Sequence, residues 1–204
     1  MDMSTTCLVT LLAATLAAPA ADWVRPIGDS LSGWKTVGKA DWSVHKGELI
    51  GRQGPNGEPG DLFSEATWKD FELEAEWRMT FPGNSGMWFR WAGPKTGCQA
   101  DFLENEPAFP GVLSGSVYCM GRQFVGVNKD PAVVRKNDWN KLRIRAVGDE
   151  IVVWLNGREV VKTRDNSQPG PGSIGVQVHA GKQFAGMEVR VRNLRVRSLD
   201  GGAK

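Results

Sequence analysis

Apolar and polar residues alternate with a period of two through most of the chain. Segment 71–79, FELEAEWRM, places Phe, Leu, Ala, Trp and Met on one face and three glutamates and an arginine on the other. This is the pattern of a strand with one buried side and one solvent-facing side. After residue 22, no window longer than about ten residues has the 3.6-residue period of a helix. The pattern therefore predicts a protein built of β-strands.

Turn signals separate these strands. Further strands are expected at 42–45, 48–52, 87–91, 99–103, 116–120, 142–146, 151–156 and 174–179. Lys46-Gly47 and Asn156-Gly157 are typical of tight hairpins. Turn residues recur every eight to twelve positions or so, which indicates an antiparallel β-sandwich or jelly roll. No repeat or linker divides residues 21–204, so a single all-β domain is expected.

In a sandwich, the parity of each strand position decides which side chains fill the core. Met87, Phe89 and Trp91 are expected to point inward. The residues between them and their counterparts on two other strands then share the non-core side, namely Trp88, Arg90, Gln99, Asp101, Gln177 and His179. We therefore expect a guanidinium, a carboxyl group and an imidazole to meet in one groove.

The charge balance narrows the class of partner. The net charge of +2 argues against nucleic acid. Segment 189–197 alternates valine and leucine with four arginines, which favours the charged face of a half-buried strand over a phosphate-binding stripe. The nine tryptophans contrast with a single tyrosine. Indole rings bind sugars as well as filling cores, so a carbohydrate partner fits this composition.

The first twenty residues resemble a secretory signal peptide. An apolar stretch, 7–21, is too short to span a bilayer and contains an Ala-Pro-Ala cleavage pattern, although no lysine or arginine precedes it. We expect a secreted or periplasmic protein with no membrane span in the mature chain. Removal of the leader leaves Cys98 and Cys119, and both a disulfide and two separate buried thiols remain open.

Metal and cofactor signals are sparse. The chain has two histidines and no His-x-x-x-His or Cys-x-x-Cys spacing, which excludes the usual zinc sites. No glycine-rich phosphate loop opens a helix, so no nucleotide cofactor is expected. The pattern predicts no metal and no cofactor, and leaves open an oxygen-ligated cation such as Ca²⁺.

Residues 84–90, Asn-Ser-Gly-Met-Trp-Phe-Arg, resemble a strand motif of the 3-keto-disaccharide hydrolase domain family. Further blocks match in the family's order, at 32–34, 69–73, 138–140, 155–157, 175–179 and 191–194. The resemblance covers nearly the whole mature chain. It implies a concanavalin A-like jelly roll and an enzyme that cleaves the glycosidic bond of 3-keto glycosides, including disaccharides.

The resemblance also implies roles for individual residues. His179 or Asp101 would remove the hydrogen at C2 that the neighbouring ketone acidifies, and Arg90 would steady the enolate oxygen. The substrate-binding set would be Trp88, Gln99, Glu104 and Gln177.

One departure from the family leaves the function open. The family usually has Gly-Tyr-Glu-x-Gln where this chain reads Gly-Cys-Gln-Ala-Asp at 97–101. Either Asp101 substitutes for the missing glutamate, or activity is altered or lost. The rival interpretations are a non-catalytic carbohydrate-binding module and a structural envelope component. A monomer or weak oligomer is expected in each case.

Overall fold

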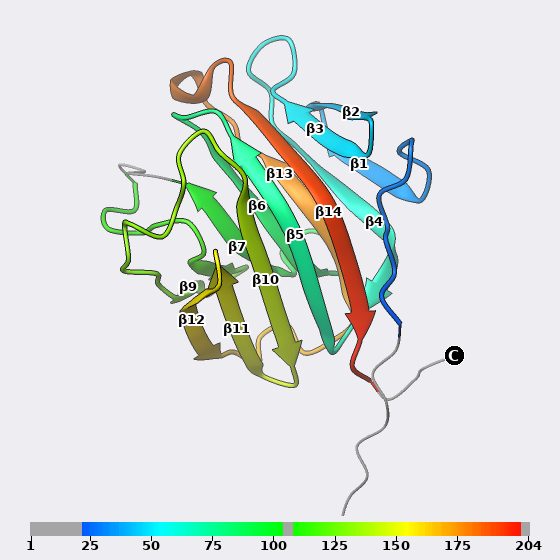
Figure 1. Cartoon of the computed structure of the whole chain (residues 1–204), viewed down its shortest axis with the longest axis vertical. Helices are drawn as coiled ribbons and strands as arrows, with labels where there is room; N and C mark the ends of the chain where they lie inside the picture. Colours follow the sequence, from blue (N-terminus) through cyan, green and yellow to red (C-terminus); the bar gives the residue numbers. More distant parts are fainter. Residues whose placement is uncertain (1–21, 104–107, 201–204) are drawn as a thin grey trace, which may run out of the picture.

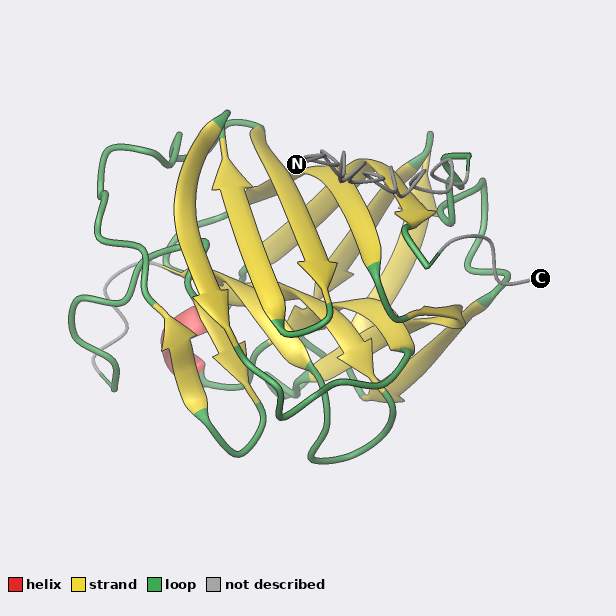
Figure 2. Ribbon diagram, turned by 90° about the horizontal axis from the view of Figure 1, so that it is seen from below, coloured by secondary structure: helices red, strands yellow, loops and turns green. Residues whose placement is uncertain are grey.

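Two seven-stranded antiparallel sheets pack face to face (Figures 1 and 2). The computed structural model describes residues 22–103 and 108–200. The first sheet has, in spatial order, the strands β1 (Trp34–Gly38), β4 (Gly60–Trp68), β13 (Gly172–Val178), β6 (Asn84–Trp91), β7 (Cys98–Leu103), β8 (Val117–Cys119) and β9 (Gln123–Gly126). The second sheet has β12 (Arg158–Arg164), β11 (Glu150–Leu155), β10 (Asn140–Val147), β5 (Phe71–Met79), β14 (Glu188–Ser198), β3 (Glu48–Arg52) and β2 (Asp41–His45). This arrangement confirms the predicted all-β sandwich.

The core lies between the sheets, and the alternation in β5 places it there. The five apolar residues of β5 are all at most 4% exposed. Trp77 stacks on Phe102 of the first sheet, with ring centroids 4.1 Å apart, and Phe71 meets Phe89 edge to face. Each fully buried large side chain contributes about 1.5–3 kcal/mol, so these contacts hold the two layers together.

The outer face of the second sheet is a ladder of ion pairs. Arg195 and Arg197 of β14 bind Glu74 and Glu72 of β5, and Arg192 binds Glu76. The predicted charged strand face is therefore neutralised by the strand beside it. Both predicted hairpins also form, and the turn residues Lys46 and Asn156 adopt the positive φ that such turns require.

Three strands were not predicted: β1, β4 and β9. The omission of β4 matters most for function. Its consecutive residues Leu62 and Phe63 are both buried, because β4 is covered on its core side and on its outer side. A strand buried on both faces has no period of two, so the alternation test does not detect it. The only helical element in the described residues is a short 3₁₀ turn, η1 (Lys182–Phe184). No helix there is long and apolar enough to cross a membrane.

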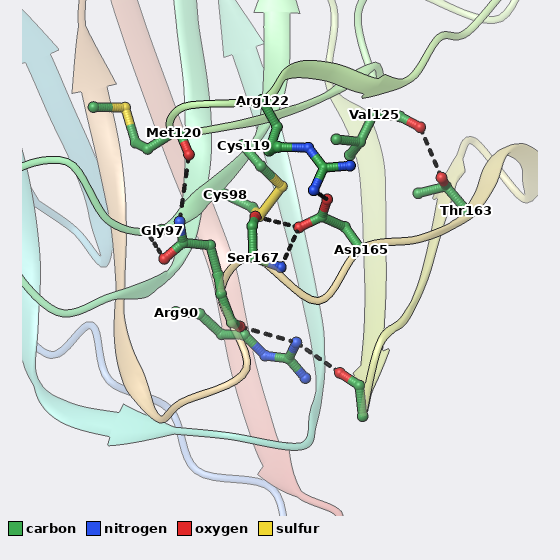
Figure 3. Close-up of a disulfide and its surroundings, with 12 residues drawn as sticks. Arg90, Gly97, Cys98, Cys119, Met120, Arg122, Val125, Thr163, Asp165 and Ser167 are labelled. Atoms are coloured by element: carbon green, nitrogen blue, oxygen red, sulfur yellow. Dashed lines mark hydrogen bonds and ion pairs between the residues drawn. A yellow bond between two sulfur atoms is a disulfide. The ribbon is translucent and has the colours of Figure 1, made fainter.

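A disulfide joins Cys98 of β7 to Cys119 of β8, which are direct partners across the two strands (Figure 3). It decides between the two alternatives that the sequence left open. The bond fixes the strands that carry Gln99 and Tyr118, the residues adjacent to the cysteines. Asp165, almost fully buried, lies against the sulfur atoms and accepts hydrogen bonds from Ser167.

Removing this disulfide should destabilise the fold. The two cysteines are 21 residues apart in sequence. A closed loop of this size restricts the unfolded chain enough to contribute about 3 kcal/mol. We expect the double variant Cys98→Ala/Cys119→Ala to lose about that much free energy of unfolding in urea titrations. Wild-type protein treated with a dithiol reductant serves as the control and should show the same loss. An unchanged urea midpoint in both samples would contradict the prediction.

Candidate functional site

A groove of about 570 Å³ lies over the outer face of the first sheet. It crosses β4, β13, β6, β7, β8 and β9. The register of the strands places its side chains in two lateral rows. The polar row runs Asp61–Gln177–Gly86–Asp101 across β4, β13, β6 and β7. The aromatic row lies two residues further along the strands and extends across β8 to β9. It runs Phe63–Gly175–Trp88–Gln99–Tyr118–Phe124.

Two glycines shape the floor of the groove. A Cβ at Gly86 would lie 2.5 Å from the side chain of Gln99. A Cβ at Gly175 would lie 2.4 Å from the ring of Phe63. Because neither position has a side chain, Gln99 and Phe63 can fold across the neighbouring strand. This explains the glycine of the Asn-Ser-Gly motif physically.

A chain of close polar contacts links the two acids. The indole nitrogen of Trp88 donates to Asp61 Oδ1 at 2.8 Å. The Gln99 amide group lies 2.6 Å from Asp101 Oδ1 and 3.3 Å from Gln177 Oε1. An ionised Asp101 would accept from the Gln99 amide nitrogen, whereas a protonated Asp101 would donate to the amide oxygen. In the first arrangement the amide oxygen accepts from the Trp88 indole nitrogen at 3.2 Å, which completes the chain from Asp61 to Asp101, whereas in the second two N–H donors would face each other there.

The surroundings of the two acids raise the pKa values of both. Burial raises the pKa of Asp61 to about 6, while the hydrogen bond from Trp88 and the charge of His179 act in the opposite direction. Burial raises the pKa of Asp101 well above its ordinary value, with no compensating cation. Burial thus makes both carboxyl groups of the groove weaker acids than an ordinary aspartate, and the pKa of about 6 leaves Asp61 ionised at neutral pH.

His179 lies just beyond the end of β13 and lines the same groove. Its Nδ1 is 2.7 Å from the carbonyl oxygen of Ala180, and its ring meets Phe184 edge to face at 5.7 Å. A carbonyl oxygen only accepts, so Nδ1 carries the hydrogen and Nε2 of the neutral ring is the acceptor. The sequence prediction that Trp88, Gln99, Asp101, Gln177 and His179 share one groove holds.

Arg90 does not belong to the groove, and its predicted place there was wrong. Trp88 pairs with Gly175 and Trp91 pairs with Ser173, so β6 contains one residue more than β13 between these positions. Arg90 sits in this bulge with a φ of 53°. An extra residue inverts the parity beyond it, so Trp91 faces the groove and Arg90 turns away.

The Arg90 side chain is instead part of a buried structural cluster, and the residue is 3% exposed. Its guanidinium donates to three carbonyl oxygens and to the Asp70 carboxylate: Lys69 O at 2.9 Å, Gly148 O at 2.8 Å, Gln168 O at 3.4 Å and Asp70 Oδ1 at 3.2 Å. These bonds tie β6 to the β4–β5 and β12–β13 loops, which connect the two sheets, and to the β10–β11 turn of the second sheet.

Two further predicted features lie outside the described residues. These are Glu104, in 104–107, and the leader at 1–20. In turn, sequence reasoning missed Asp61 and Trp91. Asp61 follows a glycine at the start of the undetected strand β4, and Trp91 follows a bulge that no residue pattern marked.

Other clusters offer less for ligand chemistry. A second hollow of about 500 Å³ lies over the second sheet, but its charged walls include the paired Glu74 and Arg195. Among the described residues, one set of three metal-ligating residue types lies close together: Cys98, Cys119 and Asp165. Two of these three side chains form the disulfide, which has no thiolate to offer a metal.

Comparison with known families shows to which family this protein belongs. Residues 22–197 match the family described as the 3-keto-alpha-glucoside-1,2-lyase-like domain. The chain belongs to this family. The resemblance noted from the Asn-Ser-Gly motif is thereby confirmed.

Individual relatives of this lyase-like domain are distant. A 3-keto-disaccharide hydrolase of Bacteroides thetaiotaomicron is 32% identical over 71 residues, which are 30% of this chain and 24% of that protein. The match thus spans about a quarter of that relative's length. A Parabacteroides distasonis protein provisionally assigned as a glycosyl hydrolase has a TM-score of 0.67 at 18% identity, covering 87% of this chain and 99% of that one.

The same fold also serves binding proteins. The carbohydrate-binding module CBM66 of Bacillus subtilis matches with a TM-score of 0.63 at 20% identity, covering 79% of this chain and 93% of that one. At these identities the structural matches show the fold alone. The lyase-like domain therefore shares its sandwich with hydrolases and with binding modules, and function must be argued from the groove.

Proposed function

We propose that this protein cleaves the glycosidic bond of 3-keto glycosides in the groove over the first sheet. The observation that carries the proposal is the pair Asp61 and Asp101, which lie in one row of the sheet and whose pKa values are both raised by burial. Two acids held in different protonation states can supply a base and a proton donor at the same pH.

Asp61 is the base in this proposal. A ketone at C3 acidifies the hydrogen at C2 of the sugar. Above a pH of about 6, Asp61 is ionised and can take that proton. The electron pair of the C2–H bond moves into the ketone and forms an enolate.

In this proposal Asp101 stabilises the enolate oxygen, the role that the sequence analysis gave to Arg90. A neutral carboxyl group in an apolar, buried site donates a strong hydrogen bond to a developing oxyanion. Asp101 is 5% exposed and lies in the polar row opposite Asp61. It would therefore stabilise the enolate oxygen while Gln177, between the two acids, orients a sugar hydroxyl.

The collapse of the enolate breaks the bond between C1 and the departing oxygen. The proton taken from C2 passes from Asp61 through Nε2 of His179 to that oxygen, so the alcohol leaves neutral and Asp61 is again a carboxylate. Water then adds across the C1–C2 double bond, with its hydroxyl at C1 and its hydrogen at C2. The products are a free 3-keto sugar and the released alcohol.

The pH dependence of kcat/KM tests this assignment. We expect kcat/KM for a 3-keto glycoside to rise as the pH increases through about 6, because Asp61 must lose its proton in the free enzyme. At higher pH it should fall, when Asp101 loses the proton that the enolate oxygen requires. The measurement is the rate of release of the free sugar in a series of buffers. A rate that is constant between about pH 5 and pH 7 would remove Asp61 from the role of base.

A non-catalytic carbohydrate-binding module is the second candidate. The observation in its favour is Gln99, which stands where the family usually has a glutamate, in a groove rich in aromatic side chains. This candidate predicts that a 3-keto disaccharide binds without release of either sugar. Stoichiometric binding with no product after prolonged incubation would favour it over cleavage.

A further inference from the structure

The carbonyl group that orients the imidazole of His179 belongs to the loop that follows β13. The Nδ1 atom of His179 lies 2.7 Å from Ala180 O, and the residue after Ala180 is a glycine. Gly181 has a φ of 126°, a conformation that other residues rarely adopt. Because glycine restricts its backbone so little, the direction of the Ala180 carbonyl group depends on contacts from outside the loop.

Gln53 makes such contacts on both sides of Ala180. Its side-chain amide nitrogen donates to His179 O at 2.9 Å and to Gly181 O at 3.0 Å. Both N–H bonds of one amide group thus hold the two peptide units that flank the acceptor of the imidazole. The ring itself meets the buried Phe184 edge to face. The bond made by one ring nitrogen of a histidine sets the tautomer and the orientation of the ring. Gln53 therefore acts on the ring through this bond.

The backbone of Gln53 is anchored on the second sheet. Gln53 follows Arg52, the last residue of β3, which pairs with β14. A tight turn comes next, in which Gly54 N donates to Glu58 O at 2.9 Å. The same segment continues into β4, where Asp61 lies eight residues after Gln53. A short hydrogen-bonded segment therefore connects Gln53 to the proposed base, and two hydrogen bonds connect it to the loop of His179.

We propose that Gln53 is a positioning residue, which keeps Nε2 of His179 free of hydrogen and directed at Asp61 and the leaving oxygen. The inference rests on the proposed function, in which Nε2 takes the proton from Asp61 and passes it on. In the other tautomer Nε2 would carry a hydrogen and could accept none from Asp61. The alcohol would then have to leave without a proton. Gln53 does not line the groove, so it acts only through His179.

Two leaving groups separate this role from a general structural one. 4-Nitrophenolate leaves a 3-keto-glucoside without a proton, whereas the methoxy group needs one from a general acid. We expect Gln53→Ala to lower kcat for methyl 3-keto-glucoside by about 10–100-fold, with KM nearly unchanged. For the 4-nitrophenyl compound of the same anomeric configuration, kcat corrected for the uncatalysed elimination should change little. Gln53→Glu keeps the size of the side chain but has no N–H to donate, so it should show the same selective loss.

Gln183→Ala is the matched control. Gln183 lies in the same loop, in η1, and is exposed, and no hydrogen bond joins its side chain to the residues that the structure describes. This variant should keep the wild-type kcat for both substrates. If Gln53→Ala and Gln53→Glu lose the same factor with both leaving groups, Gln53 only supports the fold of the loop, and the positioning role is overturned.

The tautomer of His179 gives a readout that needs no turnover. Long-range ¹H–¹⁵N correlations of the ring distinguish the Nδ1–H form from the Nε2–H form when the imidazole is neutral. We expect the Nδ1–H form in wild-type protein and a shift toward the Nε2–H form in Gln53→Ala. His45, which is exposed, is the internal reference and should not change.

The two measurements distinguish failure of this inference from failure of the proposed function. If wild-type protein cleaves its substrate but the His179 tautomer is the same in both Gln53 variants, the inference is overturned and the proposed function stands. If no 3-keto glycoside is cleaved but the tautomer shifts, the proposed function fails and the positioning of His179 by Gln53 stands.

Discussion

Replacing Asp61 with asparagine is expected to lower the turnover of a 3-keto glycoside by about 10²–10⁴-fold, the usual contribution of a positioned base. Asparagine has nearly the same shape and can still accept the hydrogen bond from Trp88, so binding should change much less than kcat. The measurement is kcat and KM for release of the free 3-keto sugar. Asp41→Asn, on the second sheet, is the matched control and should leave both constants unchanged.

The same substitution should stabilise the fold at neutral pH by about 2 kcal/mol. The pKa of Asp61 is about 6 in the folded state, against 3.8 for an ordinary aspartate. The unfolded chain therefore loses this proton first, and wild-type stability falls as the pH rises between these two values. Below the lower value Asp61 is protonated in both states, and the difference between wild type and variant disappears.

Urea titrations of both proteins between about pH 3.5 and pH 8 would show the divergence. Lower turnover together with higher stability is informative, because substitution of a purely structural residue would lower both activity and stability. A variant that is both less active and less stable would contradict the assignment of Asp61 as a buried base.

Replacing Arg90 with methionine is expected to cost about 3–5 kcal/mol of stability, the range for breaking a buried charged cluster. The substitution keeps most of the side-chain length but leaves three carbonyl oxygens and Asp70 without their donor. The measurement is the free energy of unfolding in urea. Arg164→Met removes an exposed pair with Asp149 and should change stability by less than about 1 kcal/mol.

The kinetics of Arg90→Met distinguish the two roles considered for this arginine. If it holds the loops together, the fraction of variant that remains folded should turn over substrate at nearly the wild-type kcat. If Arg90 contacts the enolate, kcat should fall by 10²-fold or so in a variant of normal stability. The second result would restore the role that strand parity suggested.

Asp101 and Arg90 show where strand parity predicts the direction of a side chain correctly and where it does not. Parity placed Gln99 and Asp101 correctly because β7 pairs with β6 and β8 without interruption at these residues. It failed at Arg90 because a bulge adds one residue, and nothing in Trp-Phe-Arg-Trp marks where that residue is inserted. The alternation of apolar and polar residues is therefore reliable only up to the first irregularity in register.

Asp61 illustrates a different limit. In its strand, residues 62–64 are buried in succession and 65–67 are exposed in succession, so the alternation from which the other strands were predicted is missing. Burial raises the pKa of Asp61, and the two groups that partly oppose this, Trp88 on β6 and His179 just beyond β13, are distant from it in sequence. Sheet order alone makes them neighbours, and sheet order is not encoded in any local pattern.

We propose that the groove over the first sheet removes the C2 proton of a 3-keto glycoside and so releases its aglycone. The most direct measurement uses a 3-keto glycoside deuterated at C2 and follows both the free sugar and its deuterium content by mass spectrometry. We predict that wild-type protein releases a 3-keto sugar that has lost deuterium to the solvent, and that Asp61→Asn releases almost none. Release of a sugar that keeps its deuterium, or binding without any release, would contradict removal of the C2 proton in this groove.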